Sequence, residues 1–303
     1  MQTIKLIHNP TAGDEEHNKE VLVEQIEKAG FVCRYSSTKD DDWKEWEEAD
    51  LIAIAGGDGT VRKVVKKVLK QKGNNKKLPI GLLALGTANN IAKTFEVDPD
   101  TEKVIESWKT AGFKKVDIGL IENVPDVDFF LEGLGFGIFP YLMKEMKNAK
   151  NEYRTPAEEL KAAQKMLHTI LMDYEPRQCH LEVDGTDHSG KFYMVEVMNI
   201  KSIGPNMVLA PMADPGDGEF EIVLVPEAHK EKFSQYLLDK LTDDDEGYHF
   251  HTLKGKNIII RWDGTRIHVD DQMMKLDKQV EVHIELKEGA LQFLVAKDEP
   301  ANR

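Results

Sequence analysis

The chain is poor in cysteine, in long apolar runs and in net positive charge. Among its 303 residues only Cys33 and Cys179 are cysteines, too few for a disulfide framework, and this usage is typical of a reducing cytoplasm. No apolar run approaches the roughly 20 residues of a membrane-spanning helix, and Met1–Lys5 lead directly into a strand pattern. We therefore expect a soluble cytoplasmic protein without a signal peptide, at most peripheral at a membrane.

The charge balance limits the possible partners. Forty basic residues against fifty-four acidic residues give a net charge of −14. Such a surface repels nucleic acid and bulk anionic membrane, so neither is an expected partner. An anionic ligand must instead be held locally, by backbone amides, by a few cations or by a metal ion.

The most informative stretch lies between residues 51 and 68. Leu51–Ala55 are all apolar and predict a buried strand of a parallel sheet. Gly56–Thr60 follow, and a helix with one apolar stripe comes next, at Val61, Val64, Val65 and Val68. A short glycine-rich loop at a helix N-terminus favours a phosphate cradle. The alternative is a tight turn in which Asp58 or Thr60 merely caps the helix.

The rest of the first part alternates between strand and helix patterns. We expect strands at Ile4–His8, Phe31–Tyr35 and Ile80–Leu85, and helices from Asp14 to Ala29 and through Trp43 and Trp46. This alternation predicts an α/β domain with a doubly wound parallel sheet. Several loops rich in glycine or hydroxyl groups follow strands, at the edge where such sheets bind ligands.

After residue 120 the pattern changes to alternating strands separated by turn signals such as Asp184-Gly185 and Asp263-Gly264. The expected strands are Phe129–Phe136, Phe192–Met198, Phe220–Val225, Asn257–Trp262, Arg266–Val269 and Val280–Leu286. One helix between them carries Leu160, Ala163, Leu167, Ile170 and Leu171 on one stripe. We predict an α/β domain at 1–120 and a mainly antiparallel β-sandwich or partly closed barrel at 121–288, with 289–303 packing back on the first domain.

Several short motifs, taken together, resemble those of the diacylglycerol kinase catalytic-domain family, particularly the small bacterial lipid kinases. They are Asn9–Gly13, Gly56–Thr60, Leu85–Asn90, Val116–Gly119, Asn199, Ala210-Pro211 and Asp217–Glu219. The glycine-rich motif also occurs in NAD kinases and sphingosine kinases. The motifs of the second half favour the bacterial lipid kinases.

The resemblance implies that a cleft between the domains binds ATP and Mg²⁺, and that the γ-phosphate passes to a hydroxyl of diacylglycerol or a related lipid. The implied nucleotide-binding residues are Asn9, Pro10, Thr11, Ala12, Gly13, Thr38, Gly56, Gly57, Asp58, Gly59, Thr60, Val61, Arg62 and Thr87. For Thr38 and Thr87 the alternative is a capping hydroxyl.

The resemblance also implies a structural Mg²⁺ site in the loop from Asp214 to Glu219. The side chain of Asp217 and the carbonyls of Asp214 and Glu219 would bind the ion, because Mg²⁺ prefers oxygen ligands. The alternative is an acidic β-turn without a metal.

Three positions depart from the family pattern, of which Leu85, in place of a proline before Gly86, is the smaller change. The general base is expected in an Asp-Gly-Glu motif, and Gln272 stands at the glutamate. A neutral amide cannot accept the proton, which leaves Asp270 or Asp271 as candidates, with Asp270 slightly preferred. Asn90 stands where the family more often has aspartate, so a carboxylate near Mg²⁺ or the acceptor is missing.

We therefore expect an ATP- and Mg²⁺-dependent lipid kinase. A nucleotide- or lipid-binding pseudokinase with little turnover is the first alternative, and an NAD kinase is the second. The lipid acceptor requires transient contact with a membrane surface. Leu134–Pro140 and the helix beginning near Thr155 are candidates for an apolar cleft, although such residues are more often core. A homodimer is the commonest default for the oligomeric state.

Overall fold

The structure is a computed structural model that describes residues 1–13, 18–45, 48–70, 78–149, 155–204, 206–242 and 250–296. The chain forms two compact units, Met1–Val116 with Gly289–Arg303 (unit 1) and Asp117–Glu288 (unit 2). The sequence-based boundary near residue 120 falls inside β5 (Gly112–Glu122). Both β5 and β18 (Glu281–Val295) contribute residues to each unit.

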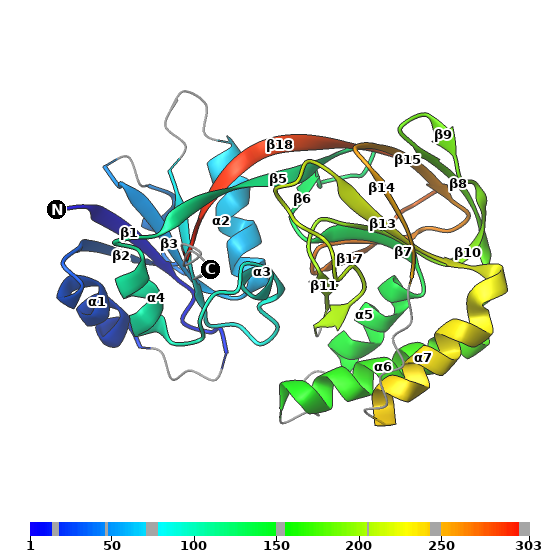
Figure 1. Cartoon of the computed structure of the whole chain (residues 1–303), viewed down its shortest axis with the longest axis horizontal. Helices are drawn as coiled ribbons and strands as arrows, with labels where there is room; N and C mark the ends of the chain where they lie inside the picture. Colours follow the sequence, from blue (N-terminus) through cyan, green and yellow to red (C-terminus); the bar gives the residue numbers. More distant parts are fainter. Residues whose placement is uncertain are drawn as a thin grey trace, which may run out of the picture. The chain divides into compact units, whose positions relative to one another are not determined.

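Unit 1 is an α/β unit around a parallel sheet with the strand order β2-β1-β3-β4-β18 (Figure 1). The strands are β1 (Thr3–His8), β2 (Val32–Ser37), β3 (Leu51–Gly56) and β4 (Ile80–Ala84), with β18 joining β4 where Phe293 pairs with Ile80. Every pairing in this series is parallel, as predicted. Since the chain leaves β1 toward β2 and leaves β3 toward β4, the loops after β1 and β3 flank a topological switch point.

Helices cover both faces of this sheet. They are α1 (Lys19–Lys28), α2 (Asp58–Lys70), α3 (Asn90–Thr94) and α4 (Thr101–Ser107). Leu22 of α1 and Ile105 of α4 share one apolar cluster with Leu6 and Ala53 of the strands. Figure 1 shows α2 on the other side of the strands. The prediction of a doubly wound sheet is therefore confirmed.

Two predicted helices differ from the structure. The first helix begins at Lys19, because the side chain of Asn18 caps it by accepting the N–H of Val21 at 2.9 Å. The part of its predicted range from 14 to 17 lies outside the described residues. The predicted polar helix is reduced to a short 3₁₀ turn, Asp42–Lys44, anchored by the buried ring of Trp43, while Trp46 lies outside the described residues.

Unit 2 is a mainly antiparallel β-sandwich, as predicted. Its longer strands are β7 (Gly133–Gly137), β8 (Arg177–Val183), β10 (Gly190–Met198), β13 (Phe220–Pro226), β14 (His251–Gly255), β15 (Asn257–Trp262), β16 (Arg266–Val269) and β17 (Gln272–Lys275). Short strands are β6 (Phe129–Phe130), β9 (Thr186–Asp187), β11 (Ser202–Ile203) and β12 (Met207–Val208). One core fills the sandwich around Phe136, Phe220 and Trp262.

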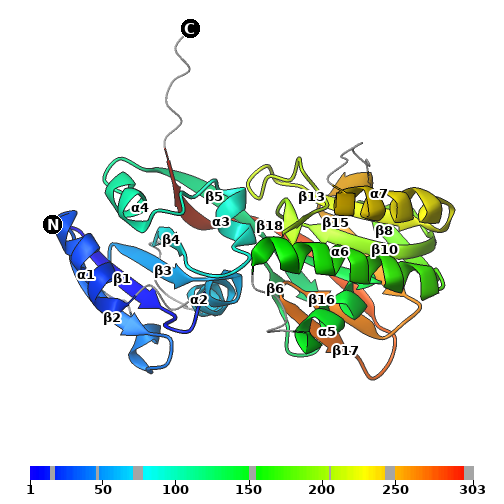
Figure 2. The same cartoon turned by 90° about the horizontal axis from the view of Figure 1, so that it is seen from below.

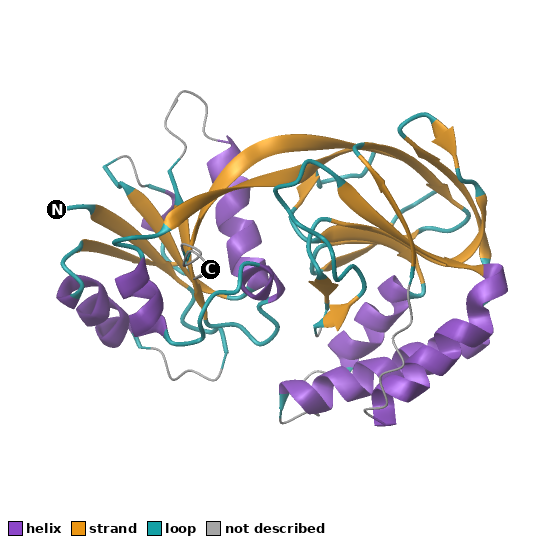
Figure 3. Cartoon of the chain, viewed as in Figure 1, coloured by secondary structure: helices purple, strands orange, loops and turns teal. Residues whose placement is uncertain are grey.

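A second core of unit 2 lies between one sheet face and three helices. These are α5 (Phe139–Asn148), α6 (Pro156–Asp173) and α7 (Lys230–Thr242), and a short 3₁₀ turn at Glu227–His229 precedes α7. Leu167 of α6, Phe233 of α7 and Val223 of β13 meet in this core. Figure 2 shows α6 and α7 side by side across the strands, and Figure 3 separates the helical layer from the sheet by colour.

Three details refine the expectations for unit 2. The predicted strand Phe129–Phe136 is two strands, β6 and β7, interrupted at Leu131 and Glu132. The predicted helix start is confirmed, because Thr155 caps α6 by accepting the N–H of Glu158. Within the residues that the structure describes, no helix is long and apolar enough to span a bilayer.

Candidate functional site

Three loops meet at the carboxyl edge of the sheet in unit 1. They follow β1, β3 and β4 and cover residues 9–13, 56–60 and 85–90. The side-chain amide of Asn9 donates to the hydroxyl of Thr60 at 3.1 Å. Gly13 has a φ of +66°, and a Cβ there would overlap the carbonyl oxygen of Leu85. The structure thus brings together the three loops that the sequence selected.

The closest approach joins the second and third loops through glycines. A Cβ at Gly57 would lie 3.0 Å from the Cα of Gly86, and a Cβ at Gly86 would overlap Gly57. The side chain of Asn89 holds the third loop, since its Oδ1 accepts the N–H of Gly86 at 2.9 Å. Its Nδ2 donates to the carbonyl of Ala84 at 3.2 Å. Glycine is required at this pair because two backbones touch there.

Asp58 connects the glycine-rich loop to α3. Its Oδ1 accepts the N–H of Ile91 at 3.0 Å, and its Oδ2 accepts the N–H of Asn90 at 2.9 Å. A carboxylate at a helix N-terminus is favoured by the free N–H groups and by the helix dipole. Asp58 was a candidate cap for the helix after the glycine-rich loop. In the structure it caps α3 instead. This contact fixes the second loop against the third.

The remaining predicted nucleotide-binding residues have different environments. Thr11 and Thr87 are exposed, while Thr38 is half-buried at the end of β2, where its N–H donates to the carbonyl of His8 at 2.8 Å. Val61 and Arg62 are buried, with 4% and 5% of their surface exposed. Because the side chains of Val61 and Arg62 are buried, they can support the loop but are not exposed to contact a ligand directly. The nucleotide-binding role of the whole set stays a prediction.

The predicted base loop lies in unit 2, at the two-residue turn between β16 and β17. Asp270 has a φ of +51° and is buried, and its Oδ1 accepts the N–H groups of Leu131, Glu132 and Gly133 at 3.0, 2.7 and 3.2 Å. A carboxylate so occupied by backbone donors fixes the turn and is poorly placed to accept a further proton. Asp271 is exposed on the same turn, as is Gln272 at the start of β17. The role of Asp270, Asp271 or Gln272 as the catalytic group stays a prediction.

Buried amides and carboxylates connect this turn to the acidic loop 214–219. The Oδ2 of Asp117 accepts the N–H of Gly218 at 3.0 Å, and the amide of Asn199 donates to the carbonyls of Asp117 and Leu131, both at 2.9 Å. Leu131 in turn donates its N–H to Asp270. The motif residues Asp117 and Asn199 therefore act structurally, by holding two loops in register.

A buried hydrogen-bonded pair of titratable side chains lies beside the turn. Gly135 of β7 pairs with Glu196 of β10 on one side and with His268 of β16 on the other, and Glu196 Oε2 lies 2.6 Å from His268 Nε2. Both side chains are 0% exposed. A Cβ at Gly135 would overlap the Glu196 carboxylate. The absence of a side chain at Gly135 therefore leaves room for the contact between Glu196 and His268. His268 Nδ1 lies 3.1 Å from the carbonyl oxygen of Asp270, which can only accept, so Nδ1 carries a proton.

The acidic loop 214–219 already faces a cation from the chain itself. Lys254 Nζ lies 3.4 Å from Asp217, 3.8 Å from Glu219 and 3.3 Å from Glu221. Burial lowers the pKa of Lys254, but the carboxylates of Glu221 and Asp217 outweigh this effect, so the pKa is raised above its ordinary value. Among the described residues no cluster of three His, Cys, Asp or Glu side chains is arranged as metal ligands. The predicted Mg²⁺ site, formed by the side chain of Asp217 and the carbonyls of Asp214 and Glu219, stays a prediction.

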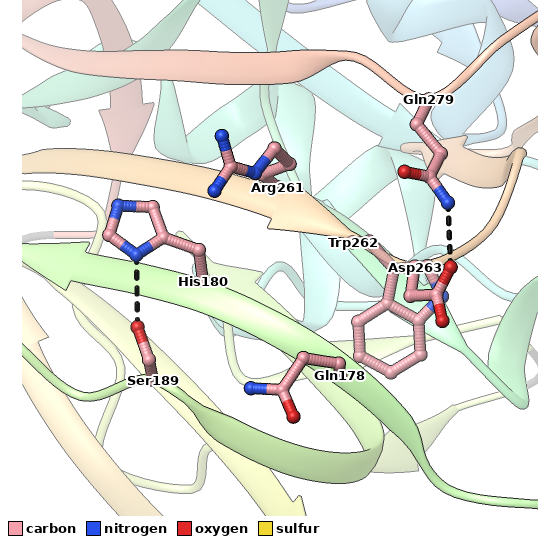
Figure 4. A pocket seen from close by; sticks show the side chains of 7 residues that line it. All are labelled: Gln178, His180, Ser189, Arg261, Trp262, Asp263 and Gln279. Carbon is pink, nitrogen blue, oxygen red and sulfur yellow. Dashed lines mark hydrogen bonds between the residues drawn. The ribbon is translucent and has the colours of Figure 1, made fainter.

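A polar pocket on β8 and β15 of unit 2 contains none of the predicted site residues (Figure 4). Its volume is about 460 Å³. His180 Nδ1 lies 3.0 Å from Ser189 Oγ, and the Gln279 amide donates to Asp263 at 2.6 Å. Ser189 also bonds Asp187, so the serine is not aligned as a nucleophile activated by the histidine. We assign no chemistry to this pocket.

The fold defines a class, a chain with one α/β unit that carries glycine-rich loops after its strands and one β-sandwich unit. The "Diacylglycerol kinase catalytic domain" matches residues 3–121, and the "YegS C-terminal NAD kinase beta sandwich-like domain" matches residues 144–292. Residues 3–121 therefore match the catalytic domain of a kinase family, and residues 144–292 match the β-sandwich domain.

Relatives and solved structures agree with this assignment. A protein of Bacillus subtilis (strain 168) named "Diacylglycerol kinase" is 24% identical over 243 residues, 77% of each chain. A protein of Staphylococcus aureus (strain MSSA476) named "Putative lipid kinase SAS0691" is 23% identical over 286 residues, 92% of this chain and 88% of the relative. The crystal structure of "a putative diacylglycerol kinase from Bacillus anthracis str. Sterne" has a TM-score of 0.75 at 19% identity, covering 98% of this chain and 97% of that one, which shows the same fold.

Sequence reasoning missed the side chains that hold these loops. They are Asn89, Glu196, Glu221, Lys254 and His268. A signal was present for Glu196, Glu221 and His268, because each interrupts an apolar run, as in Val195-Glu196-Val197, whereas Lys254 has no such signal. Burying a charged side chain between apolar neighbours destabilises the fold unless a partner binds it, so such positions indicate buried polar contacts.

Proposed function

We propose that the chain is a lipid kinase that transfers the γ-phosphate of ATP, bound with Mg²⁺ as the substrate complex, to a hydroxyl of diacylglycerol or a related lipid. The observation that carries the proposal is the convergence of loops 9–13, 56–60 and 85–90 at the switch point of the parallel sheet. The match to the diacylglycerol kinase catalytic domain and the names of the relatives support the lipid acceptor.

The loops suit a polyphosphate for physical reasons. Helix α2 begins directly after two glycines, so phosphate oxygens can approach the backbone at its N-terminus without obstruction by side chains. A protein with a net charge of −14 needs local donors to hold an anion. Asp58 keeps the loops closed against α3, so the donors are pre-positioned before a nucleotide arrives.

The transfer step requires a hydroxyl oxygen, a phosphorus atom and a proton acceptor. The lipid oxygen forms a bond to the γ-phosphorus, the bond from that phosphorus to the bridging oxygen breaks, and ADP leaves. The hydroxyl proton passes to a carboxylate. We assign that role to Asp271, because Asp270 is occupied by backbone N–H groups and Gln272 is neutral.

Gln272 and Asn90 favour one alternative, a protein that binds nucleotide or lipid with little turnover. Asn90 is 2% exposed and its N–H donates to Asp58, so an amide side chain stands beside the cradle. ADP formation separates the two functions. It should rise with diacylglycerol in detergent micelles and Mg²⁺ if the chain is a kinase, and stay at background while ATP binding persists if it is not.

Three variants make this experiment specific. Asp58→Ala should abolish ADP formation and weaken ATP binding measured by calorimetry, because it releases α3 from the glycine-rich loop. Asp271→Asn should lower turnover about 10²-fold or more and leave ATP binding unchanged. The exposed Asp277→Asn, in the same unit, is the matched control. If Asp271→Asn retains full turnover, the proton acceptor lies elsewhere.

A further inference from the structure

Unit 2 contains an apolar cavity under its helical layer. Its volume is about 770 Å³, within the range of small-molecule sites. Leu160 of α6 and Tyr236 and Leu237 of α7 line one side, and Leu209 and Ala210 of the loop after β12 line another. None of the motifs that resemble nucleotide-binding loops contributes to it. The third side is the sheet, through β13 and β14.

The wall formed by β14 changes from charged to apolar along its length. Lys254 pairs in register with Glu221 of β13, Thr252 pairs with Val223, and Phe250 comes directly before the strand. All three alternate residues of this segment, at 250, 252 and 254, line the cavity. The cavity therefore has a polar end at Glu221 and Lys254 and an apolar end at Phe250 and Tyr236. A ligand that fits it is amphiphilic.

Glu221 is the unusual group at the polar end. It is 2% exposed, and neither of its carboxylate oxygens has a well-aligned hydrogen bond within the described residues. Lys254 lies at ion-pair distance, 3.3 Å from Oε1, but it is 46% exposed and is shared with Asp217 and Glu219. A buried carboxylate that lacks hydrogen bonds gains from a donor supplied by a ligand. Burial raises the pKa of Glu221, against the opposing effect of the nearby Lys254.

The loop that borders the cavity also carries exposed apolar side chains. Val208 is 48% exposed and Met212 is 80% exposed, and both line the cavity. Neighbouring exposed apolar groups at the edge of an apolar cavity are typical of a site that receives its ligand from an apolar phase. Together with the polar end, this edge argues for a lipid rather than for a water-soluble metabolite.

We propose that this cavity binds an apolar chain of a lipid whose head group donates a hydroxyl or amino hydrogen to Glu221. The inference rests on the proposed function only in taking this lipid as the acceptor, since binding itself needs neither ATP nor turnover. Glu221 acts as a specificity determinant, because its carboxylate accepts a hydrogen bond from a head group that can donate one and repels an anionic head group. Acylglycerols and long-chain amino alcohols satisfy this chemistry, whereas fatty acids and their methyl esters do not.

The test measures binding to the full chain without nucleotide, by displacement of a fluorescent fatty-chain ligand below its aggregation concentration. The competitors are monopalmitoylglycerol, sphingosine, palmitate and methyl palmitate, which share a long chain and differ in the head group. Wild type should bind one or both donor-bearing lipids at least tenfold more tightly than methyl palmitate, because a hydrogen bond to a charged group is worth about 1.5–3 kcal/mol. Equal affinities for all four would overturn the role of Glu221.

Two variants locate the site. Glu221→Gln keeps the shape and removes the charge, so the preference for a donor should fall about tenfold while the affinity for methyl palmitate is retained. Ala210 is 2% exposed and lines the cavity, so Ala210→Leu should reduce the cavity volume. This variant should lower the affinity for all four lipids. Thermal melting of each variant confirms the fold, and Glu221→Gln decides the matter alone if Ala210→Leu does not fold. Folded variants that bind like wild type would overturn the proposal.

Kinase assays on the same proteins separate this inference from the proposed function. Selective lipid binding without ADP formation leaves the cavity assignment standing and overturns the kinase. Lipid-dependent ADP formation that neither folded variant alters overturns the cavity assignment and leaves the kinase standing. The expected result is that both variants raise the KM for the lipid and leave the KM for ATP unchanged.

Discussion

Two buried glutamates of unit 2 lie on the same face of the sheet and have different surroundings. Glu196 of β10 pairs in register with Val223, and Glu221 of β13 pairs with Met198, so both face the helical layer to which Val223 and Met198 belong. Glu196 is enclosed against His268, whereas Glu221 borders a cavity and a half-exposed Lys254. Burial raises the pKa of both carboxyls.

The difference teaches that a perturbed pKa does not by itself identify a site. At Glu196 the partner is a side chain of the chain itself, held at 2.6 Å by strand register, and there is no room for a ligand above Gly135. At Glu221 the charged partner is the half-exposed Lys254, 3.3 Å away, and both side chains line the cavity. We therefore interpret the first glutamate as structural and the second as a recognition group.

The largest expected effect comes from breaking the enclosed pair. His268→Leu should lower the free energy of unfolding by about 3–5 kcal/mol, because it leaves Glu196 buried without its partner. The double variant Glu196→Met with His268→Leu should recover most of this loss, since an apolar pair needs no hydrogen bonds. Urea unfolding of both variants measures the coupling. Additive losses would show that the pair is not a unit.

Gly135→Ala should lower the free energy of unfolding by about 2–3 kcal/mol, somewhat less than His268→Leu. The added methyl group displaces the Glu196 carboxylate from His268. Gly185→Ala is the matched control. Gly185 has a φ of +81° with open space around its Cα, so only backbone strain of roughly 1 kcal/mol is expected. If the two variants unfold at the same urea concentration, Gly135 is not a spacer for the pair of Glu196 and His268.

Lys254→Met should have a smaller effect on stability, about 1 kcal/mol, because the ammonium group is half-exposed and screened by solvent. The variant leaves Asp217, Glu219 and Glu221 without their shared cation. Mg²⁺ or Ca²⁺ should then raise the melting temperature of the variant more than that of wild type. A larger rise in wild type that Asp217→Ala removes would instead support the metal site predicted at this loop.

The smallest effect is a change in how stability depends on pH. Burial raises the pKa of Glu221 above its ordinary value of 4.5, so the folded chain holds this proton more tightly than the unfolded chain. Stability from this group is therefore present below that ordinary value and is lost as pH rises toward the folded pKa, at no more than about 1.4 kcal/mol per pH unit. The charged groups that face it are Lys254, Asp217 and Glu219.

Glu221→Gln should remove this contribution, and urea midpoints between pH 4.5 and 8 measure it. Glu196→Gln provides the comparison, since burial raises that pKa as well. Monopalmitoylglycerol should alter the pH dependence of wild type and of Glu196→Gln but not that of Glu221→Gln. Equal responses in all three proteins would contradict the distinction between the two glutamates.

Much of unit 1 could be predicted from the sequence because its signals are local. A fully apolar run such as Leu51–Ala55 can only be a buried strand here, and the glycines after it can only form a close turn. The Gly57 and Gly86 contact was not predictable, because it depends on β3 and β4 being neighbours. In unit 2 the interruption at Leu131 and Glu132 was missed, since it is imposed by Asp270 from a distant strand.

The sequence by itself determined the α/β and β-sandwich halves, the three loops after strands and the family resemblance. The reason is that hydrophobic periodicity and short motifs are local properties of the sequence. Only the tertiary structure decided what the carboxylates do. Asp58 caps α3, Asp270 binds the backbone of residues 131–133, and Glu221 borders a cavity. The physical reason is that a carboxylate takes its role from the donors that reach it, and those donors come from strands and helices far away in the sequence.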